Sequence, residues 1–222
     1  MKKIMFNDKY SLTQAVLDGR KTMTRRMAAI QPPYKNSEIC FPTVLLLEDE
    51  PEKHPLWLAY CWRNKDNPEE STPWIKPKYK KGEVVAIAQS YKDLGYSPEE
   101  PLQEEAGYYP HIKDASGWTN KMFVRADIMP HHIRITDIKI ERLQDISDED
   151  CLREGVELNT RQYEYDGTKK YCVCGLGHWR AIGCTDFDTP REAFAALIDK
   201  VSGKGTWESN PYVFVYEFEL ID

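Results

Sequence analysis

The pattern of hydrophobic and polar positions predicts both strands and helices in this chain. Residues 82–89 form a turn followed by a continuous apolar run, as in a strand buried on both faces. Residues 212–220 carry an apolar side chain at every even position, which is typical of a strand. We therefore expect a central strand at 82–89 and a terminal strand at 212–220.

A third predicted strand, over residues 133–140, has an irregular pattern. Its apolar positions are odd-numbered before Thr136 and even-numbered after it. Because side chains alternate strictly along a regular strand, this change of phase predicts a β-bulge. A bulge here would change the direction of the side chains of Arg134, Thr136 or Asp137.

Three segments carry the signals of a helix start. Residues 11–14 have the form of a capping box and predict a short helix over about 11–18, which Gly19 ends. Residues 147–150 predict a second short helix with an acidic first turn, closed by Gly155. The clearest start is at 189–192, where a capping threonine precedes a proline. Four apolar residues at helical spacing mark the buried face of that helix: Phe194, Leu197, Ile198 and Val201.

Between these elements lie three polar stretches, about 31–73, 95–120 and 157–188. Each contains clusters of proline, glycine or charged residues, so we interpret them as insertions in loops. A chain of 222 residues can bury one sizeable core and does not require a second. We therefore expect a single α+β domain over 1–222, a small mixed β-barrel with a few flanking helices and long loop insertions.

Composition and charge exclude several classes of protein. The formal net charge of −6 argues against a protein that coats nucleic acid through many lysines and arginines, although a local basic patch is compatible with it. The N-terminal residues turn polar too soon for a secretion signal, and no apolar run approaches the length of a membrane span. Six cysteines without such a signal indicate reduced thiols. We therefore expect a cytoplasmic protein with no membrane partner.

The densest group of chemically active side chains is at residues 19–26. This octapeptide holds four cationic and two hydroxyl side chains directly after the first predicted helix. If it is extended, Lys21 and Arg25 face one side while Thr24 and Arg26 face the other, whereas a turn would bring Lys21 and Thr24 together. A solvated basic loop is the simplest alternative to a functional pocket.

Within this octapeptide, Gly19, Lys21, Thr24 and Arg26 match the Gly-x-Lys-x-x-Thr/Glu-x-Arg signature of the ASCH family. The similarity continues in the same order along the chain at 80–84, 135–147 and 207–214. The whole resembles the phage-related and bacterial branch of that family. The resemblance implies a PUA-like β-barrel with a pocket that accepts a nucleobase, a nucleoside or an RNA end.

The resemblance also indicates which side chains meet the ligand. Lysine and arginine supply charge and donors for phosphate or carbonyl groups, and aromatic rings stack on bases. The leading hypothesis is therefore a cationic module that binds RNA or a modified nucleoside and uses no cofactor. The expected ligand-binding residues are Lys21, Thr24, Arg25, Arg26, Gln89, Tyr91, Arg134, Trp207 and Asn210.

A second hypothesis is hydrolysis of acylated nucleosides. One bacterial ASCH protein is an amidohydrolase that acts on N(4)-acetylcytidine, and Lys21 and Thr24 match its catalytic lysine and threonine. In such a mechanism the lysine activates the threonine or a water, and a carboxylate positions or shuttles the proton. The carboxylate is expected on the strand 133–140, where the register places Arg134. Asp137 replaces it only if the bulge turns its side chain inward.

Two departures from the family pattern favour binding over catalysis. Arg134 takes the place of the expected strand carboxylate, and Gln89 stands where an acidic residue is expected after the central strand. Glu83 and Glu141 are more distant candidates for the acid. A third hypothesis is a protein-interaction module of a phage or mobile element, in which the pocket is vestigial and the insertions make the contacts.

Cysteines and histidines suggest a metal site, but their spacing argues against one. The residues Cys172, Cys174, His178 and Cys184 form a Cys-x-Cys-x3-His-x5-Cys pattern, which is not common among structural zinc sites. The pair at 131–132 precedes a strand, and paired histidines there are more typical of surface structure than of a catalytic base. We therefore expect a protein without bound metal.

Overall fold

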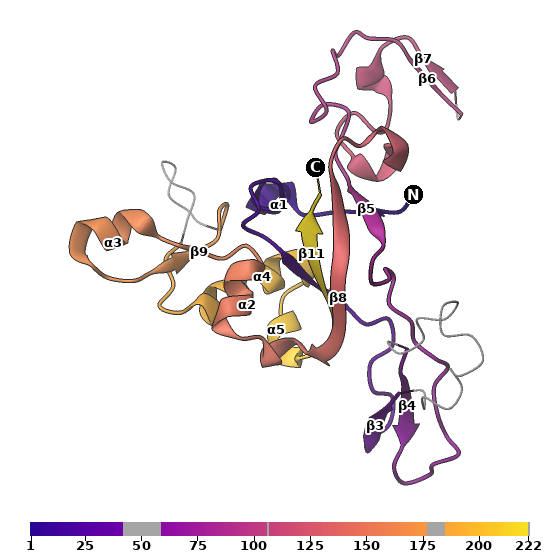
Figure 1. Ribbon diagram of the computed structural model, residues 1–222, viewed down its shortest axis with the longest axis vertical. Coiled ribbons are helices and arrows are strands. Elements are labelled where there is room, and N and C mark those ends of the chain that lie inside the picture. Colours follow the sequence, from indigo (N-terminus) through magenta and orange to yellow (C-terminus); the bar gives the residue numbers. More distant parts are fainter. Residues whose placement is uncertain (42–58, 106, 177–184, 222) are drawn as a thin grey trace.

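The fold is built on a five-stranded sheet with the order β1-β5-β8-β11-β2 (Figure 1). The structure, a computed structural model, describes residues 1–41, 59–105, 107–176 and 185–221. β1 runs parallel to β5, and the other neighbours are antiparallel. The strands are β1 (Lys3–Ile4), β2 (Met23–Met27), β5 (Val84–Ile87), β8 (His132–Arg142) and β11 (Tyr212–Leu220). The three strands predicted from the sequence are therefore confirmed as the inner strands of this sheet.

The predicted bulge is present in β8. Glu217 of β11 pairs with Asp137, but the next residue, Phe218, pairs with Ile135. Thr136 is thus the extra residue on β8, at the position where the apolar phase changes. The bulge keeps the isoleucines on both sides of it buried, which explains why the sequence pattern slips there.

The helices lie mainly on one side of the sheet, where Figure 1 shows α2, α4 and α5 grouped together. Their bounds are α1 (Leu12–Leu17), α2 (Asp148–Arg153), α3 (Thr160–Asp166), α4 (Pro190–Ser202) and α5 (Thr206–Ser209). Short 3-10 turns occupy Asp8–Tyr10, Ile112–Asp114, Lys121–Phe123, Ala126–Ile128 and Leu143–Asp145.

Two of the three predicted helix caps are formed. Thr189 accepts a hydrogen bond from the Glu192 amide at 3.1 Å, and Glu192 accepts one from the Thr189 amide at 3.3 Å, which completes a capping box. Ser147 caps α2 by accepting from the Asp150 amide at 3.1 Å. Local sequence signals therefore locate both of these helix starts.

The capping box predicted at 11–14 is wrong, although α1 itself is present. Ser11 has a φ of 52° and makes no side-chain cap bond to the helix. It also ends the preceding 3-10 turn, with its amide donating to the carbonyl of Asp8. A left-handed residue that closes one turn cannot also adopt the extended conformation of an N-cap.

The main hydrophobic core lies between the sheet and the helices and continues under the first insertion. β5 and β8 supply fully buried aliphatic residues, and α4 adds Phe194. On the other side, the rings of Tyr60 and Trp62 pack against Phe214 and Tyr212 of β11, with centroids 5.6 and 4.6 Å apart. Both faces of β11 are therefore covered.

The three predicted insertions extend from the sheet as arms (Figure 1), and they are not loops throughout. Each holds a two-stranded antiparallel sheet. The pairs are β3 (Ser37–Cys40) with β4 (Cys61–Asn64), β6 (Leu102–Glu104) with β7 (Gly107–Tyr109), and β9 (Glu157–Leu158) with β10 (Tyr171–Cys172). Polar composition concealed these short strands.

The fold class is α+β, as predicted. Among the described residues the strands do not close into a barrel, because β1 and β2 remain as the edges of the central sheet. No helix in the described ranges is long and apolar enough to cross a membrane.

Candidate functional site

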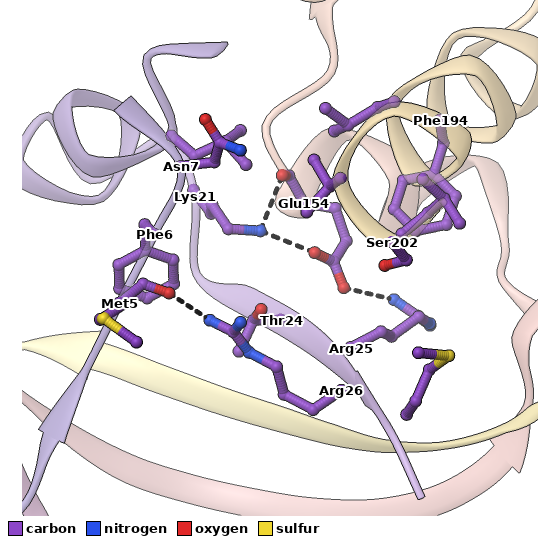
Figure 2. A pocket seen from close by; sticks show the side chains of 15 residues that line it. Met5, Phe6, Asn7, Lys21, Thr24, Arg25, Arg26, Glu154, Phe194 and Ser202 are labelled. Carbon is purple, nitrogen blue, oxygen red and sulfur yellow. Dashed lines mark hydrogen bonds and ion pairs between the residues drawn. The ribbon is translucent and has the colours of Figure 1, made fainter. Parts of the chain in front are cut away.

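A cavity of about 380 Å³ opens beside β2, between the N-terminal segment, the end of α2 and α4 (Figure 2). Its lining includes Lys21, Thr24, Arg25 and Arg26. The other lining residues are Met5, Phe6, Asn7, Leu12, Met27, Glu154, Phe194, Leu197, Ile198, Val201 and Ser202. The four predicted ligand-binding residues of the octapeptide 19–26 thus meet around one concavity.

The octapeptide 19–26 is a turn followed by an edge strand. Gly19 has a φ of 72°, a left-handed conformation that allows the chain to reverse after α1. The Lys21 amide still donates to the carbonyl of Ala15, which holds the lysine against the helix end. β2 then begins at Met23 and pairs along its length with β11. The turn and the strand together direct these side chains toward the same space.

Lys21 is buried and paired with Glu154. Its Nζ donates to Oε2 of Glu154 at 2.6 Å and to the main-chain carbonyl of the same residue at 2.7 Å. Because Glu154 is the C-cap of α2, the ammonium also meets the negative end of the helix dipole. Burial lowers the pKa of Lys21, and the Glu154 carboxylate opposes part of that shift.

Gly155 follows Glu154 in a backbone conformation that favours glycine. Its φ is 104°, and a Cβ built there would lie 3.0 Å from a methyl carbon of Leu12 and 3.7 Å from Cδ of Lys21. A larger residue would be strained by its backbone and crowded by its neighbours. The glycine predicted to close the helix therefore allows the positive φ and the close approach of Leu12 beside the Lys21–Glu154 pair.

Arg25 is surrounded by carboxylates. Its guanidinium lies 2.6 Å from Glu141, 3.1 Å from Asp150 and 3.1 Å from Glu154. Its side chain is 0% exposed. These partners come from β8 and α2, so the cluster ties the edge strand to the helix layer. A guanidinium with three anionic partners has little hydrogen-bonding capacity left for a ligand.

Two cations of the predicted cationic pocket are therefore already paired within the protein. Lys21 and Arg25 share the carboxylate of Glu154, and Arg25 is neutralised further by Glu141 and Asp150. The charges that looked available in the sequence stabilise one another inside the protein. This arrangement resists a polyanion and is compatible with a neutral group.

Thr24 and Arg26 lie on the opposite face of β2 from Arg25, as alternation along a strand requires. Arg26 donates to the carbonyl of Met5 at 2.6 Å, and its guanidinium lies 5.8 Å from the ring centroid of Phe6. Figure 2 shows Thr24 below the Lys21–Glu154 pair, with its hydroxyl turned toward that pair. The hydroxyl and the buried ion pair thus face the same part of the cavity.

α4 supplies the apolar wall opposite β2. Phe194 and Leu197 are buried, whereas Val201 is 39% exposed at the rim. The apolar stripe predicted for this helix is therefore both core and cavity wall.

No family model, curated protein or solved structure matches this chain.

Two predicted site residues on β8 lie away from the cavity. Arg134 is exposed and pairs with Glu219 at 3.1 Å, and Asp137 pairs with Lys81 at 3.2 Å. The bulge at Thr136 does not turn Asp137 toward Lys21 and Thr24. None of residues 134–137 lines the cavity, so the expectation that this strand supplies the acid is wrong.

The aromatic and amide side chains that were predicted to contact the ligand contact other parts of the protein instead. Tyr91 is buried in a separate hydrophobic cluster. Trp207 packs edge-on against Phe194, with centroids 6.1 Å apart. Asn210 accepts a hydrogen bond from the Gln144 amide at 2.8 Å. None of these three predicted residues lines the cavity.

Gln89 lines a different hollow, of about 320 Å³, together with Asp8 and Asp93. Its Oε1 is buried and has no hydrogen-bond partner among the described residues. Glu83 pairs with Lys2 at 3.0 Å on the surface. Neither Gln89 nor Glu83 therefore belongs to the Lys21 cavity.

The cysteine-rich segment is described only in part. His178 and Cys184 lie outside the described residues, so the four-residue pattern cannot be followed as a unit. Within the described ranges, no group of three or more histidine, cysteine, aspartate or glutamate residues is placed to hold a metal ion.

The residue that the sequence interpretation missed is Glu154. A carboxylate at the C-terminal end of a helix is unfavourable in the helix dipole, so it requires a compensating cation. The position of Glu154 directly before Gly155, at the predicted end of the second helix, was a usable signal of such a cation. Phe6 was also missed, since a single aromatic residue in a polar segment carries no pattern.

Proposed function

We propose that the Lys21 cavity binds a small nucleobase-containing molecule and hydrolyses an amide bond that attaches an acyl group to it. The observation that carries the proposal is the Glu154 carboxylate, 2.6 Å from the buried Nζ of Lys21 in a cavity that Thr24 also lines. The sequence favours binding over catalysis because the carboxylate expected on the strand 133–140 is missing. Glu154 supplies a carboxylate from another element, which removes this argument against catalysis.

The shape and polarity of the cavity support a small ligand. Its volume of about 380 Å³ falls within the range of small-molecule pockets, about 300–1,000 Å³. One wall is the apolar stripe of α4, and the other carries a few polar groups of β2. Such a combination accommodates a flat ring and fixes its orientation through a small number of hydrogen bonds.

The chemistry assigns a role to each of the three polar residues. Burial lowers the pKa of Lys21, so that its neutral amine is accessible and can take the proton of the Thr24 hydroxyl as the oxygen attacks the acyl carbon. The resulting ammonium returns the proton to the nitrogen that leaves. A water then attacks the acyl-threonine ester: Lys21 and Glu154 accept its proton, the acyl group leaves as a carboxylic acid, and the proton returns to the Thr24 oxygen.

The ASCH resemblance and the PUA-like fold belong to the same proposal. Support comes from where the family-like segments lie: 19–26 leads into β2, 80–84 into β5, 135–147 covers most of β8 and the turn after it, and 207–214 leads into β11. All four therefore lie on or beside the central sheet that carries the cavity.

The test is turnover of acylated nucleosides, with N(4)-acetylcytidine as the first substrate and free base or nucleoside as the product to detect. Thr24→Val removes the hydroxyl at constant shape and should lower kcat by about a thousandfold or more. Glu154→Gln should also lower kcat, because the amide cannot accept a proton. Thr24→Ser should retain measurable turnover.

Arg134→Glu and Lys200→Ala serve as surface controls, since both residues are exposed and line no part of the cavity. Equal turnover by wild type and Thr24→Val would rule out the assigned nucleophile. Tight binding without turnover in any variant would reduce the proposal to a nucleoside-binding module.

A further inference from the structure

A second hollow adjoins the Lys21 cavity. It has a volume of about 240 Å³, and Met5, Arg26 and Met27 line both spaces. Arg26 therefore stands at the boundary, with its guanidinium held by the carbonyl of Met5 at 2.6 Å. A ligand that fills the first cavity can extend past Arg26 into the second.

The cations of this second hollow differ from those of the first. Lys76 and Lys78 are exposed and line it, and no described carboxylate forms an ion pair with either. The hollow has no acidic residue in its lining. The carboxylate on the neighbouring turn is Glu83, and it is already paired with Lys2 at 3.0 Å. Uncompensated positive charge is therefore concentrated here, and not around Lys21.

The floor of the hollow is aromatic and rigid. Tyr79, Phe214 and Tyr216 are buried, and the polar atoms of the two tyrosines are occupied. The Tyr79 hydroxyl donates to the carbonyl of Lys3 at 3.0 Å, and the Tyr216 hydroxyl accepts from the Lys78 amide at 2.9 Å. The second of these bonds fixes the main chain that carries the lysine. The rings offer apolar surface, and the rim offers charge.

We propose that this second hollow, formed by Arg26, Lys76 and Lys78 over the floor of Tyr79, binds the phosphate of a ligand whose base occupies the Lys21 cavity. The inference rests on the proposed function and specifies its substrate class: a nucleotide or the end of an RNA strand, rather than a free nucleoside. Lysine and arginine donors are suited to phosphate oxygens, and the aromatic floor to a sugar.

The charges favour the base in the first cavity and the phosphate in the second hollow. In the first cavity Lys21 and Arg25 already have carboxylate partners, so placing a phosphate beside them would bring it close to Glu154. In the second hollow a phosphate meets cations alone. Electrostatic repulsion from one space and attraction to the other therefore orient a nucleotide with its base beside Thr24 and its phosphate beside Lys78.

The experiment compares affinities of the four ribonucleosides with those of their 5′-monophosphates by calorimetry, since these compounds carry no acyl group and are not consumed. At least one monophosphate should bind about tenfold or more tightly than its nucleoside, and the gain should shrink as salt is raised. In Lys76→Gln/Lys78→Gln the ratio of the two affinities should fall toward one. The matched variant Lys65→Gln/Lys92→Gln removes two exposed lysines that line neither hollow, and should keep the ratio.

A three-nucleotide RNA distinguishes the two sources of phosphate. If it binds more tightly than the monophosphate, the hollow recognises a phosphodiester of a strand, and if it does not, the ligand is a mononucleotide. Either result supports the inference. Equal affinity of nucleoside and monophosphate would overturn it while leaving the proposed function intact.

Inorganic pyrophosphate separates failure of the inference from failure of the proposed function. If no nucleoside or nucleotide binds and no acylated nucleoside is turned over, the proposed function fails. The second hollow is then upheld only if pyrophosphate binds the wild type and Lys76→Gln/Lys78→Gln weakens that binding about tenfold or more. Absence of pyrophosphate binding in that case would overturn the phosphate site as well.

Discussion

The ammonium of Lys21 lies 2.6 Å from a carboxylate oxygen of Glu154, and both side chains are almost completely buried. The same ammonium donates to the carbonyl of Glu154, the C-cap of α2, and the same carboxylate also contacts Arg25. A single glutamate therefore pairs with two cations, one in the turn before the edge strand and one on the strand itself. Stability and the proposed catalysis both involve this arrangement, so variants must be interpreted with both in mind.

Removing Glu154 and removing Lys21 should lower the free energy of unfolding by different amounts. Glu154→Leu leaves the charge of Lys21 buried and unpaired, and should cost about 3–5 kcal/mol of unfolding free energy. Lys21→Met should cost less than half of that, because Glu154 keeps Arg25 as a partner at 3.1 Å. Urea unfolding at pH 7 measures both. Equal losses would show that Arg25 does not compensate for the missing lysine.

The cost of Glu154→Leu should also depend on pH. Burial lowers the pKa of Lys21 below its ordinary value of 10.5, so the unfolded chain binds more protons than the folded one between the two values. The contribution of Lys21 to the free energy of unfolding therefore rises with pH between its folded and unfolded pKa values. The penalty of Glu154→Leu should shrink as pH approaches 10.5. Unfolding midpoints of variant and wild type at pH 7 and pH 10 provide the measurement, and a constant difference would contradict the argument.

The rate of hydrolysis should follow the titration of Lys21. If its neutral amine takes the Thr24 proton, kcat/KM rises with pH and levels off below 10.5, since burial lowers the pKa of this lysine. Lys21→Arg should be inactive at every pH, because a guanidinium does not release its proton. A pH profile that stays flat in the wild type, or an active Lys21→Arg variant, would exclude the lysine as the base.

Arg25 should matter for stability more than for ligand binding. Arg25→Lys keeps the charge, but one ammonium cannot satisfy Glu141, Asp150 and Glu154 as the guanidinium does. We expect a loss of about 2 kcal/mol or more in urea unfolding, as for a broken buried network. Arg134→Lys, on an exposed pair with Glu219, should change stability by less than about 0.5 kcal/mol. Similar effects of the two substitutions would argue against the buried cluster.

Two cysteines should differ sharply in reactivity. Cys151 of α2 is buried, and burial raises the pKa of its thiol to about 12, so little thiolate is present at pH 8. Cys174 is exposed. Iodoacetamide followed by peptide mass analysis should label Cys174 in the native protein, and Cys151 only after unfolding. Early labelling of Cys151 would indicate that α2 opens readily.

Much of the sheet and of the helix layer was accessible from the sequence, because the responsible signals are local. The phase change at Thr136 predicted the bulge, and the residues at 189–192 predicted the start of α4. The failure at Ser11 has a local cause too, since the preceding 3-10 turn sets its backbone conformation. Pattern alone does not reveal which of two neighbouring turns a residue belongs to.

The candidate site was accessible only in part, because its charge balance depends on distant residues. The octapeptide 19–26 identified the cavity, but the partners of Lys21 and Arg25 lie 133 and 116 positions away in the chain. No spacing rule links them. The aromatic assignments failed for a related reason: Tyr91 and Trp207 resemble base-stacking residues in composition, whereas three-dimensional packing places them against protein.

The position of β11 between β2 and β8 has a consequence for how the protein is made. β2 reaches the rest of the sheet only through β11, and β11 is the last described strand in sequence. During synthesis, β2 therefore has no partner strand until residues 212–220 have left the ribosome. Closure over so many intervening residues is intrinsically slow. The nascent chain should thus pass through a state in which helices and arms are formed while β2 is still unpaired and the second hollow lacks Phe214 and Tyr216 in its floor, and this state is the one most exposed to chaperones and proteases.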